Sequence, residues 1–241
     1  MSATMLKFIM AFIMVLDHIE FFISPELAAF FHLISRPVAP VFAYLAIEGF
    51  IHTRNQKKYI SRLYLAAFAM ILGNFIINNF VLMDPGFFVR NNIFLSLALG
   101  TTSLYIYEEY FKNQKLLGLL LIFLVLIVSL SSEGGIFLVP FMLICYINRD
   151  NTKKRNIILI MITAFLAYGS YGYLMEMNIE STIILLGFGA DSLFFIAGIP
   201  FMYLYNGKRG LSNQFTKYFF YVFYPLHLWI IHIIAAFNII G

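Results

Sequence analysis

Residues 6–19 read LKFIMAFIMVLDHI. After Lys7, an apolar run over residues 8–16 leads to the adjacent ionisable residues Asp17 and His18. Extended to residue 24, this segment has the length of about 20 residues that a helix needs to cross a bilayer. An ionised side chain near the centre of a bilayer costs roughly 2.5–3.5 kcal/mol, so such residues usually serve a function. The segment therefore predicts a membrane helix that carries part of a site.

Similar apolar runs fill the rest of the 241 residues, of which 61% are hydrophobic and 12% charged. A typical soluble domain has roughly 45–50% apolar and about 25% charged residues, which excludes a water-soluble globule. We therefore predict an all-α, polytopic membrane helical bundle of about nine spans. It forms a single domain over residues 1–241. The expected spans cover residues 5–24, 27–53, 60–80, 91–110, 116–132, 135–148, 156–175, 182–205 and 217–240.

The loops between these spans alternate in charge. Fourteen of the 16 basic residues belong to the loop regions on one side: Lys7, Arg54, Lys57, Lys58, Arg62, Lys112, Lys115, Arg149, Lys153, Lys154, Arg155, Lys208, Arg209 and Lys217. The opposite loops carry Asp84, Glu133, Glu176 and Glu180, with Arg90 as their only cation. The positive-inside rule then places the N-terminus in the cytoplasm and the C-terminus outside. We expect the first helix to be retained, because ionisable residues interrupt it and no clear small-residue cleavage site follows.

Several polar residues fall inside the expected spans. Counted along helices at about 1.5 Å per residue, His18, Asp191 and His227 lie at similar depths near the midplane, so three helices can meet in one site. Tyr44, Glu48 and His52 follow at i, i+4 and i+8 on one helix face, and point towards the cytoplasm. This face leads to the cluster of Arg54, Lys57, Lys58 and Arg62, which suits a phosphorylated cytosolic donor.

Each of these features also has a structural explanation. The basic loops obey the positive-inside rule whatever the function, and Asp191 with Arg36 is also explained as a structural ion pair. We favour positions near the membrane interfaces for His32 and His232, and interhelical hydrogen bonding for Asn74, Asn78 and Asn79. Cys145 is alone, and the five histidines have no metal-ligand spacing, so we expect neither a disulfide nor a metal site. Nucleic-acid binding is not expected, because the basic residues lie in short loops.

Six motifs carry a resemblance to a known family. They are residues 6–19 quoted above, SRPVAPVFAY at 35–44, EGFIHTR at 48–54, YISRL at 59–63, NIFLSLALG at 92–100 and YPLHL at 224–228. The chain resembles the TraX family in these motifs, with Ser35 in place of the usual glycine. The match is specific over residues 5–100 and again over 218–232, and rests only on hydrophobic character between them.

The resemblance implies a membrane-embedded acyltransferase of a bacterial cytoplasmic membrane that takes acetyl groups from cytosolic acetyl-CoA. The best-known family member N-acetylates a conjugative pilin subunit. Carried over by position, His18 is the catalytic histidine, with Asp17, Arg36, Glu48 and His227 in the site. Neutral imidazole is a suitable base near pH 7, so we expect His18 to deprotonate the acceptor.

This chemistry also predicts roles for the residues around His18. Asp17 or Asp191 would orient His18, although adjacent helical residues point about 100° apart and His227 is an alternative partner. Arg36 or an asparagine would stabilise the tetrahedral oxyanion. Glu48, His52 and the cluster Arg54, Lys57, Lys58 and Arg62 are the expected acetyl-CoA-binding residues. The acceptor stays open between an amine and a hydroxyl of a pilin, a peptide or an envelope glycan.

Two other classes compete with an enzyme. Ionisable residues at mid-membrane also form the proton relays of transporters. Transporters often have paired broken helices, whereas the sequence indicates one clear break, at Pro37 and Pro40 of the second span. A non-catalytic component of a pilus or secretion machine would need an exposed soluble domain or a docking segment, and the sequence has neither.

Overall fold

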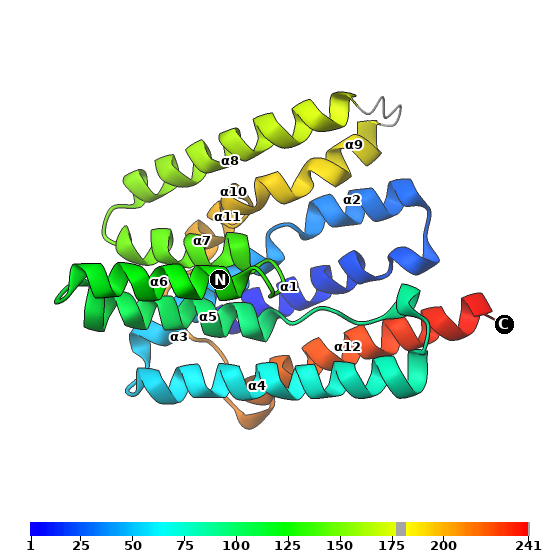
Figure 1. The fold of residues 1–241 in the computed structure, drawn as a ribbon, viewed down its shortest axis with the longest axis horizontal. Helices are drawn as coiled ribbons and strands as arrows, with labels where there is room; N and C mark the ends of the chain where they lie inside the picture. Colours follow the sequence, from blue (N-terminus) through cyan, green and yellow to red (C-terminus); the bar gives the residue numbers. More distant parts are fainter. Residues whose placement is uncertain (177–181, 241) are drawn as a thin grey trace.

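The structure, a computed structural model, describes residues 1–176 and 182–240. All regular elements in these residues are helical, and they run back and forth along the long axis of the molecule (Figure 1). The predicted all-helical class is confirmed. Glu180, which we assigned to an outer loop, lies outside the described residues.

Four stretches are long and apolar enough to cross a membrane. The first is Pro25–His52, which contains α2 (Pro25–Ser35) and α3 (Val38–His52). The second is Gln56–Leu82, which contains α4 (Gln56–Ile77) and the π turn η2 (Asn78–Leu82). The third is α8 (Thr152–Glu176), and the fourth is Gln214–Asn238 of α12 (Gln214–Ile240). The count of nine spans and the cytoplasmic N-terminus stay predictions.

The other helices are shorter and occupy the remaining expected segments. They are α1 (Ala3–His18), α5 (Ile93–Ile106), α6 (Lys115–Ser129), α7 (Gly135–Ile147), α9 (Thr182–Gly189), α10 (Phe194–Ala197) and α11 (Ile199–Leu204). Short 3-10 or π turns extend or join several of them: η1 (Glu20–Phe22), η3 (Pro85–Phe87), η4 (Tyr107–Phe111) and η5 (Ala190–Leu193).

Three of the expected spans are interrupted. The first, over residues 5–24, is helical only to His18 in α1, and the 3-10 turn η1 follows after Ile19. The break between α2 and α3 falls at Arg36 and Pro37, because proline provides no amide hydrogen for the helical ladder. The span over 182–205 is also divided, by the 3-10 turn η5 and by a cap at Gly198. The interpretation that only the second span is clearly broken is therefore wrong. The argument that a transporter should have paired broken helices therefore no longer counts against this class of protein.

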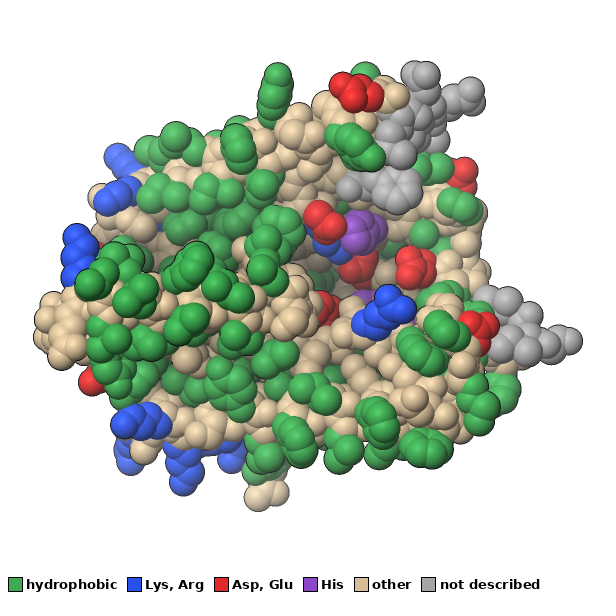
Figure 2. Space-filling view, viewed as in Figure 1, with side chains coloured by type: hydrophobic (Ala, Val, Ile, Leu, Met, Phe, Trp, Pro, Cys, Tyr) green, Lys and Arg blue, Asp and Glu red, His purple; other side chains and the backbone are tan. Residues whose placement is uncertain are grey.

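The outer surface of the bundle is apolar. Large side chains on α6 and α8 are mostly exposed, including Leu116 at 73% and Phe165 at 78%, and Phe12 of α1 is 70% exposed. Figure 2 shows hydrophobic side chains spread along this face, with Lys and Arg gathered mainly at one end of the long axis. An apolar surface of this extent is far larger than soluble monomers expose, so it fits a lipid bilayer.

Candidate functional site

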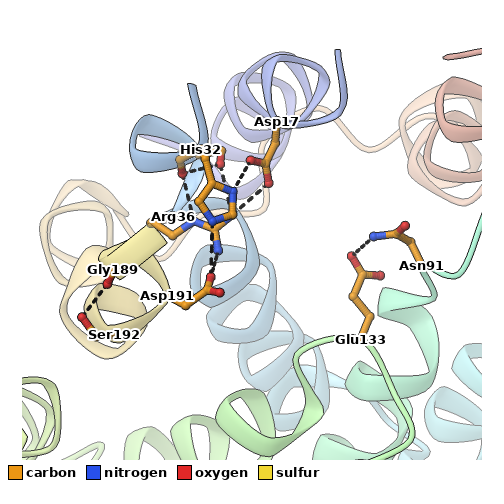
Figure 3. A network of polar contacts seen from close by, with 9 residues as sticks. Asp17, His32, Arg36, Asn91, Glu133, Gly189, Asp191 and Ser192 are labelled. Atoms are coloured by element: carbon orange, nitrogen blue, oxygen red, sulfur yellow. Dashed lines mark hydrogen bonds and ion pairs between the residues drawn. The ribbon is translucent and has the colours of Figure 1, made fainter. Parts of the chain in front are cut away.

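The centre of the site is a cluster of charges between α1, α2 and η5 (Figure 3). Asp17, at the end of α1, accepts a hydrogen bond from Arg36 Nη2 at 2.9 Å through Oδ2. Its other oxygen lies 2.9 Å from His32 Nδ1. Arg36 Nη1 also donates to Asp191 Oδ1, and its Nε donates to the backbone oxygen of His32 at 2.9 Å. Arg36 therefore holds two carboxylates from separate segments, and its contact with Asp191 is the ion pair that we gave as the structural alternative for these two residues.

Close packing of α9 against α2 brings Asp191 to this cluster. A Cβ atom at Gly187 would lie only 2.5 Å from the Cβ of Ala29, so a larger residue there would push the two helices apart. The 3-10 turn that carries Asp191 is fixed by Ser192, whose hydroxyl donates to the Gly189 oxygen at 2.6 Å (Figure 3). This helix break is therefore part of the site.

His18 lies next to this cluster without joining it. Among the described residues it has no hydrogen-bond partner, and both oxygens of Asp17 bind His32 and Arg36 instead. The His18 ring packs against that of His227, with 5.4 Å between the ring centroids. The arrangement therefore favours His227, rather than a carboxylate, as the partner of His18.

His227 itself is buried on α12. Its Nδ1 lies 2.9 Å from the backbone oxygen of Phe223, and its ring stacks on the Phe223 ring at 5.0 Å. Because that Nδ1 must donate to a carbonyl, Nε2 carries the lone pair. Nε2 is buried and has no hydrogen-bond partner among the described residues. This nitrogen is thus free to accept a proton or a hydrogen bond.

A cavity of about 630 Å³ lies beside the charged cluster and His18, and His227 is not among its lining residues. Asp17, His18, His32, Arg36 and Asp191 all line it, as do His232 and Glu133. Its volume falls in the range of about 300–1,000 Å³ that is typical of small-molecule sites. The cavity is large enough to hold a reacting group beside His18.

Glu133 is a site residue that the sequence interpretation missed. We assigned it to an outer loop, but the loop between α6 and α7 turns it inward. Its carboxylate accepts a hydrogen bond from Asn91 Nδ2 at 2.9 Å (Figure 3). It accepts a second hydrogen bond from Tyr224 Oη at 2.5 Å. Burial raises the pKa of this carboxyl group, because a charged carboxylate loses its hydration there. Nothing in the sequence around it indicates the inward turn.

His32 also belongs to the charged cluster, although we favoured only a structural position near the membrane interface for it. Its two ring nitrogens lie 2.9 Å from Asp17 Oδ1 and 3.6 Å from Asp191 Oδ1. The available signal was its position four residues before Arg36, which puts both side chains on one helix face. His232 also proves to be a cavity residue, with Nδ1 2.8 Å from the backbone oxygen of Phe87.

The expected acetyl-CoA residues lie apart from this cavity, at the turn between α3 and α4. Glu48 and His52 share one face of α3, as predicted, with 3.6 Å between His52 Nε2 and Glu48 Oε2. The basic members of the set are exposed and do not line the cavity: Arg54, Lys57, Lys58 and Arg62. Tyr59 and Leu63 of α4 line it instead, together with the two lysines Lys7 and Lys217.

Tyr224 offers a test of how Glu133 is held. Tyr224→Phe removes the hydroxyl that donates to Glu133 and accepts from the Ile93 amide at 3.1 Å. We expect the free energy of unfolding in detergent to fall by about 1–3 kcal/mol, the cost of leaving buried polar groups unpaired. Tyr218→Phe, at an exposed position of the same helix, is the matched control and should cost almost nothing. Equal effects of the two substitutions would contradict this geometry.

Comparison with known proteins shows the family to which the chain belongs. The model of the TraX protein family matches residues 2–235. The chain belongs to the TraX family. A curated relative, the probable fimbrial assembly protein FimC, serogroup H1, of Dichelobacter nodosus, is 26% identical over 234 residues. The match covers 94% of this TraX family chain and 93% of that protein. No solved structure gives a significant match.

Proposed function

We propose that this TraX family member is a membrane acyltransferase that moves an acetyl group from cytosolic acetyl-CoA to an amine or hydroxyl. The acceptor is a pilin, a peptide or an envelope glycan. The observation that carries the proposal is the cavity in which the imidazole of His18, backed by that of His227, lies beside the Asp17–His32–Arg36–Asp191 cluster. The name of the fimbrial relative supports a pilin-related role in the membrane.

In the proposed reaction His18 takes the proton from the acceptor while the acceptor nitrogen or oxygen attacks the thioester carbonyl carbon. The new C–N or C–O bond forms, the C–S bond breaks, and the proton passes to the departing CoA thiolate. The packing of the His227 ring against the His18 ring supports a role for His227 in orienting that imidazole during this transfer. His227 thus takes the role that we had assigned to Asp17 or Asp191.

The hydrogen bonds of Arg36 also change the role that we propose for it, compared with the role expected from the sequence. Its Nη1, Nη2 and Nε atoms already donate to Asp191, Asp17 and the His32 backbone. We therefore assign Arg36 to positioning the two acidic residues at the cavity wall, rather than to direct donation to the oxyanion. The set of Glu48, His52, Arg54, Lys57, Lys58 and Arg62 stays a proposal for attracting acetyl-CoA at the protein surface.

Mass spectrometry of envelope fractions tests the function. Cells with the wild-type protein should contain a pilin, peptide or glycan species heavier by one acetyl group than the same species in cells that lack the protein. Restoring the gene should restore the acetylated species. Identical envelope spectra in the two strains, with the protein present in the membrane of the first, would contradict the proposal.

A proton-coupled transporter is the second candidate, because both α2–α3 and the span over 182–205 are broken at the charged cluster. Broken helices frame the binding sites of many transporters. This candidate predicts proton movement by the purified protein in vesicles, without acetyl-CoA. The acyltransferase proposal predicts no proton movement under those conditions.

A further inference from the structure

Two lysines line the cavity at some distance from the imidazoles. Lys7 lies on α1 and Lys217 on α12, and in the described residues neither forms an ion pair with a carboxylate. The third basic residue on the cavity wall, Arg36, is already bound by Asp17 and Asp191. The cavity therefore has an uncompensated positive charge at Lys7 and Lys217.

The two lysines lie at the same level, because α1 and α12 run parallel and side by side. Phe8 packs against Phe219 near the start of both helices, with 4.9 Å between ring centroids, and His18 packs against His227 near the end of α1. Eleven residues separate Lys7 from His18, and ten separate Lys217 from His227. At 1.5 Å per residue, each lysine is about 15–17 Å along its helix from the paired imidazoles.

The surroundings of the lysines increase the positive charge. The loop that precedes α12 carries Lys208 and Arg209, and their backbone oxygens accept the amides of Ala3 at 2.9 Å and Thr4 at 3.1 Å. This bonding fixes the basic loop to the start of α1. Residues 1–16 and 192–241 contain no Asp or Glu. A concentrated positive field of this kind attracts anions, and most strongly at the mouth of a cleft.

We propose that Lys7 and Lys217 bind the phosphate groups of the acyl donor, so that the donor enters the cavity between α1 and α12. The assignment rests on the proposed acyltransferase function and adds the position of the donor. The pantetheine arm of CoA is a long flexible chain between the phosphates and the thioester. It would bridge the distance along the cavity and bring the thioester to His18. Arg54, Lys57, Lys58 and Arg62 are exposed and outside the cavity, so they do not fix this position.

Anionic lipid headgroups carry the same phosphate chemistry and are a second source of a ligand for these lysines. Half-burial of Lys7, whose Nζ lies 5.5 Å from the centre of the Phe220 ring, favours a ligand inside the cavity over a headgroup at the surface. The two sources are distinguished by the lipid around the protein. Discs of zwitterionic phosphatidylcholine contain no anionic headgroups.

The test compares binding of CoA and of pantetheine to the full chain in phosphatidylcholine discs by calorimetry. Replacing both lysines, by Lys7→Gln and Lys217→Gln, should weaken CoA binding at least about tenfold, the equivalent of 1.4 kcal/mol. Pantetheine binding should stay unchanged, because pantetheine has no phosphate. Lys153→Gln with Lys154→Gln, which removes two exposed charges at the start of α8, is the control and should leave CoA binding unchanged. Lys7→Arg with Lys217→Arg should preserve CoA binding and so exclude misfolding as the cause.

Three results would overturn the assignment. Equal CoA binding by the wild-type and the Lys7→Gln, Lys217→Gln protein would refute the lysine site and leave the proposed function standing. An effect of these substitutions that appears only in discs with phosphatidylglycerol would assign the lysines to lipid headgroups. A wild-type protein that binds neither CoA nor pantetheine would contradict the acyltransferase function itself, and the donor site with it.

Discussion

His18→Ala lowers the rate of acetyl transfer by about 10²–10⁴-fold, the usual contribution of a general base. The reason is that His18 is the histidine that both lines the cavity and packs on the buried His227 ring. The measurement is the rate at which membranes containing each variant at equal amounts transfer acetyl groups to envelope acceptors.

The control for His18→Ala is Phe12→Ala on the same helix, because Phe12 is 70% exposed on the outer surface and does not line the cavity. Its transfer rate should match that of the wild-type protein. His18 packs on the His227 ring but makes no hydrogen bond among the described residues, so His18→Ala should lower the free energy of unfolding in detergent only by the lost packing. A variant that keeps its fold and most of its rate would remove His18 from the mechanism.

Arg36→Gln lowers the free energy of unfolding by up to about 3–5 kcal/mol. It removes the guanidinium that bonds both Asp17 and Asp191. Among the described residues, only His32 then stays as a basic partner of these carboxylates. The side chains of Arg36 and Asp17 are 16% and 19% exposed, so water screens this pair little. Asp191 is 60% exposed and contributes less. Unfolding in detergent, followed for Arg36→Gln alone and combined with Asp17→Asn, measures the coupling between the two residues. The double variant should recover part of the lost stability.

The exposed pair of Lys112 and Glu108 provides the comparison. Its atoms Nζ and Oε2 are 2.5 Å apart, one helical turn from each other, yet Lys112 is 49% exposed. Exposed pairs contribute about 0–1 kcal/mol, so Lys112→Gln should hardly change the unfolding free energy. A loss on Arg36→Gln as small as the loss on Lys112→Gln would show that the charged cluster does not hold α1, α2 and η5 together.

The helices were predictable from sequence because membrane spans depend mainly on the length of apolar runs, which local composition reveals. The span expected at 135–148 corresponds to α7 (Gly135–Ile147), and the one at 156–175 falls within α8. The interruption at η5 was not predictable in the same way. No proline marks it, and the close approach of Gly187 to Ala29 just before it is a tertiary contact that the local sequence does not reveal.

The candidate site was predictable where an ionisable residue interrupts an apolar run, as Asp17, His18, Asp191 and His227 do. Sequence could not give the pairing among these residues, because it depends on the rotation of each helix about its axis. The inward position of Glu133 was missed for a related reason: loop acids are normally solvated, and its partner Tyr224 lies 91 residues away. The sequence identified Lys7 and Lys217 only as basic residues that set the membrane orientation, and not as residues of the cavity wall.

The most direct test of the central claim follows an isotope-labelled acetyl group from acetyl-CoA, added on the cytoplasmic side of membrane vesicles, into envelope molecules. The account predicts that vesicles with the wild-type chain transfer the label to a pilin, peptide or glycan. It also predicts that vesicles with His18→Ala transfer it at a rate lower by at least about two orders of magnitude. Absence of label with the wild-type protein, or equal labelling with both proteins, would contradict the account.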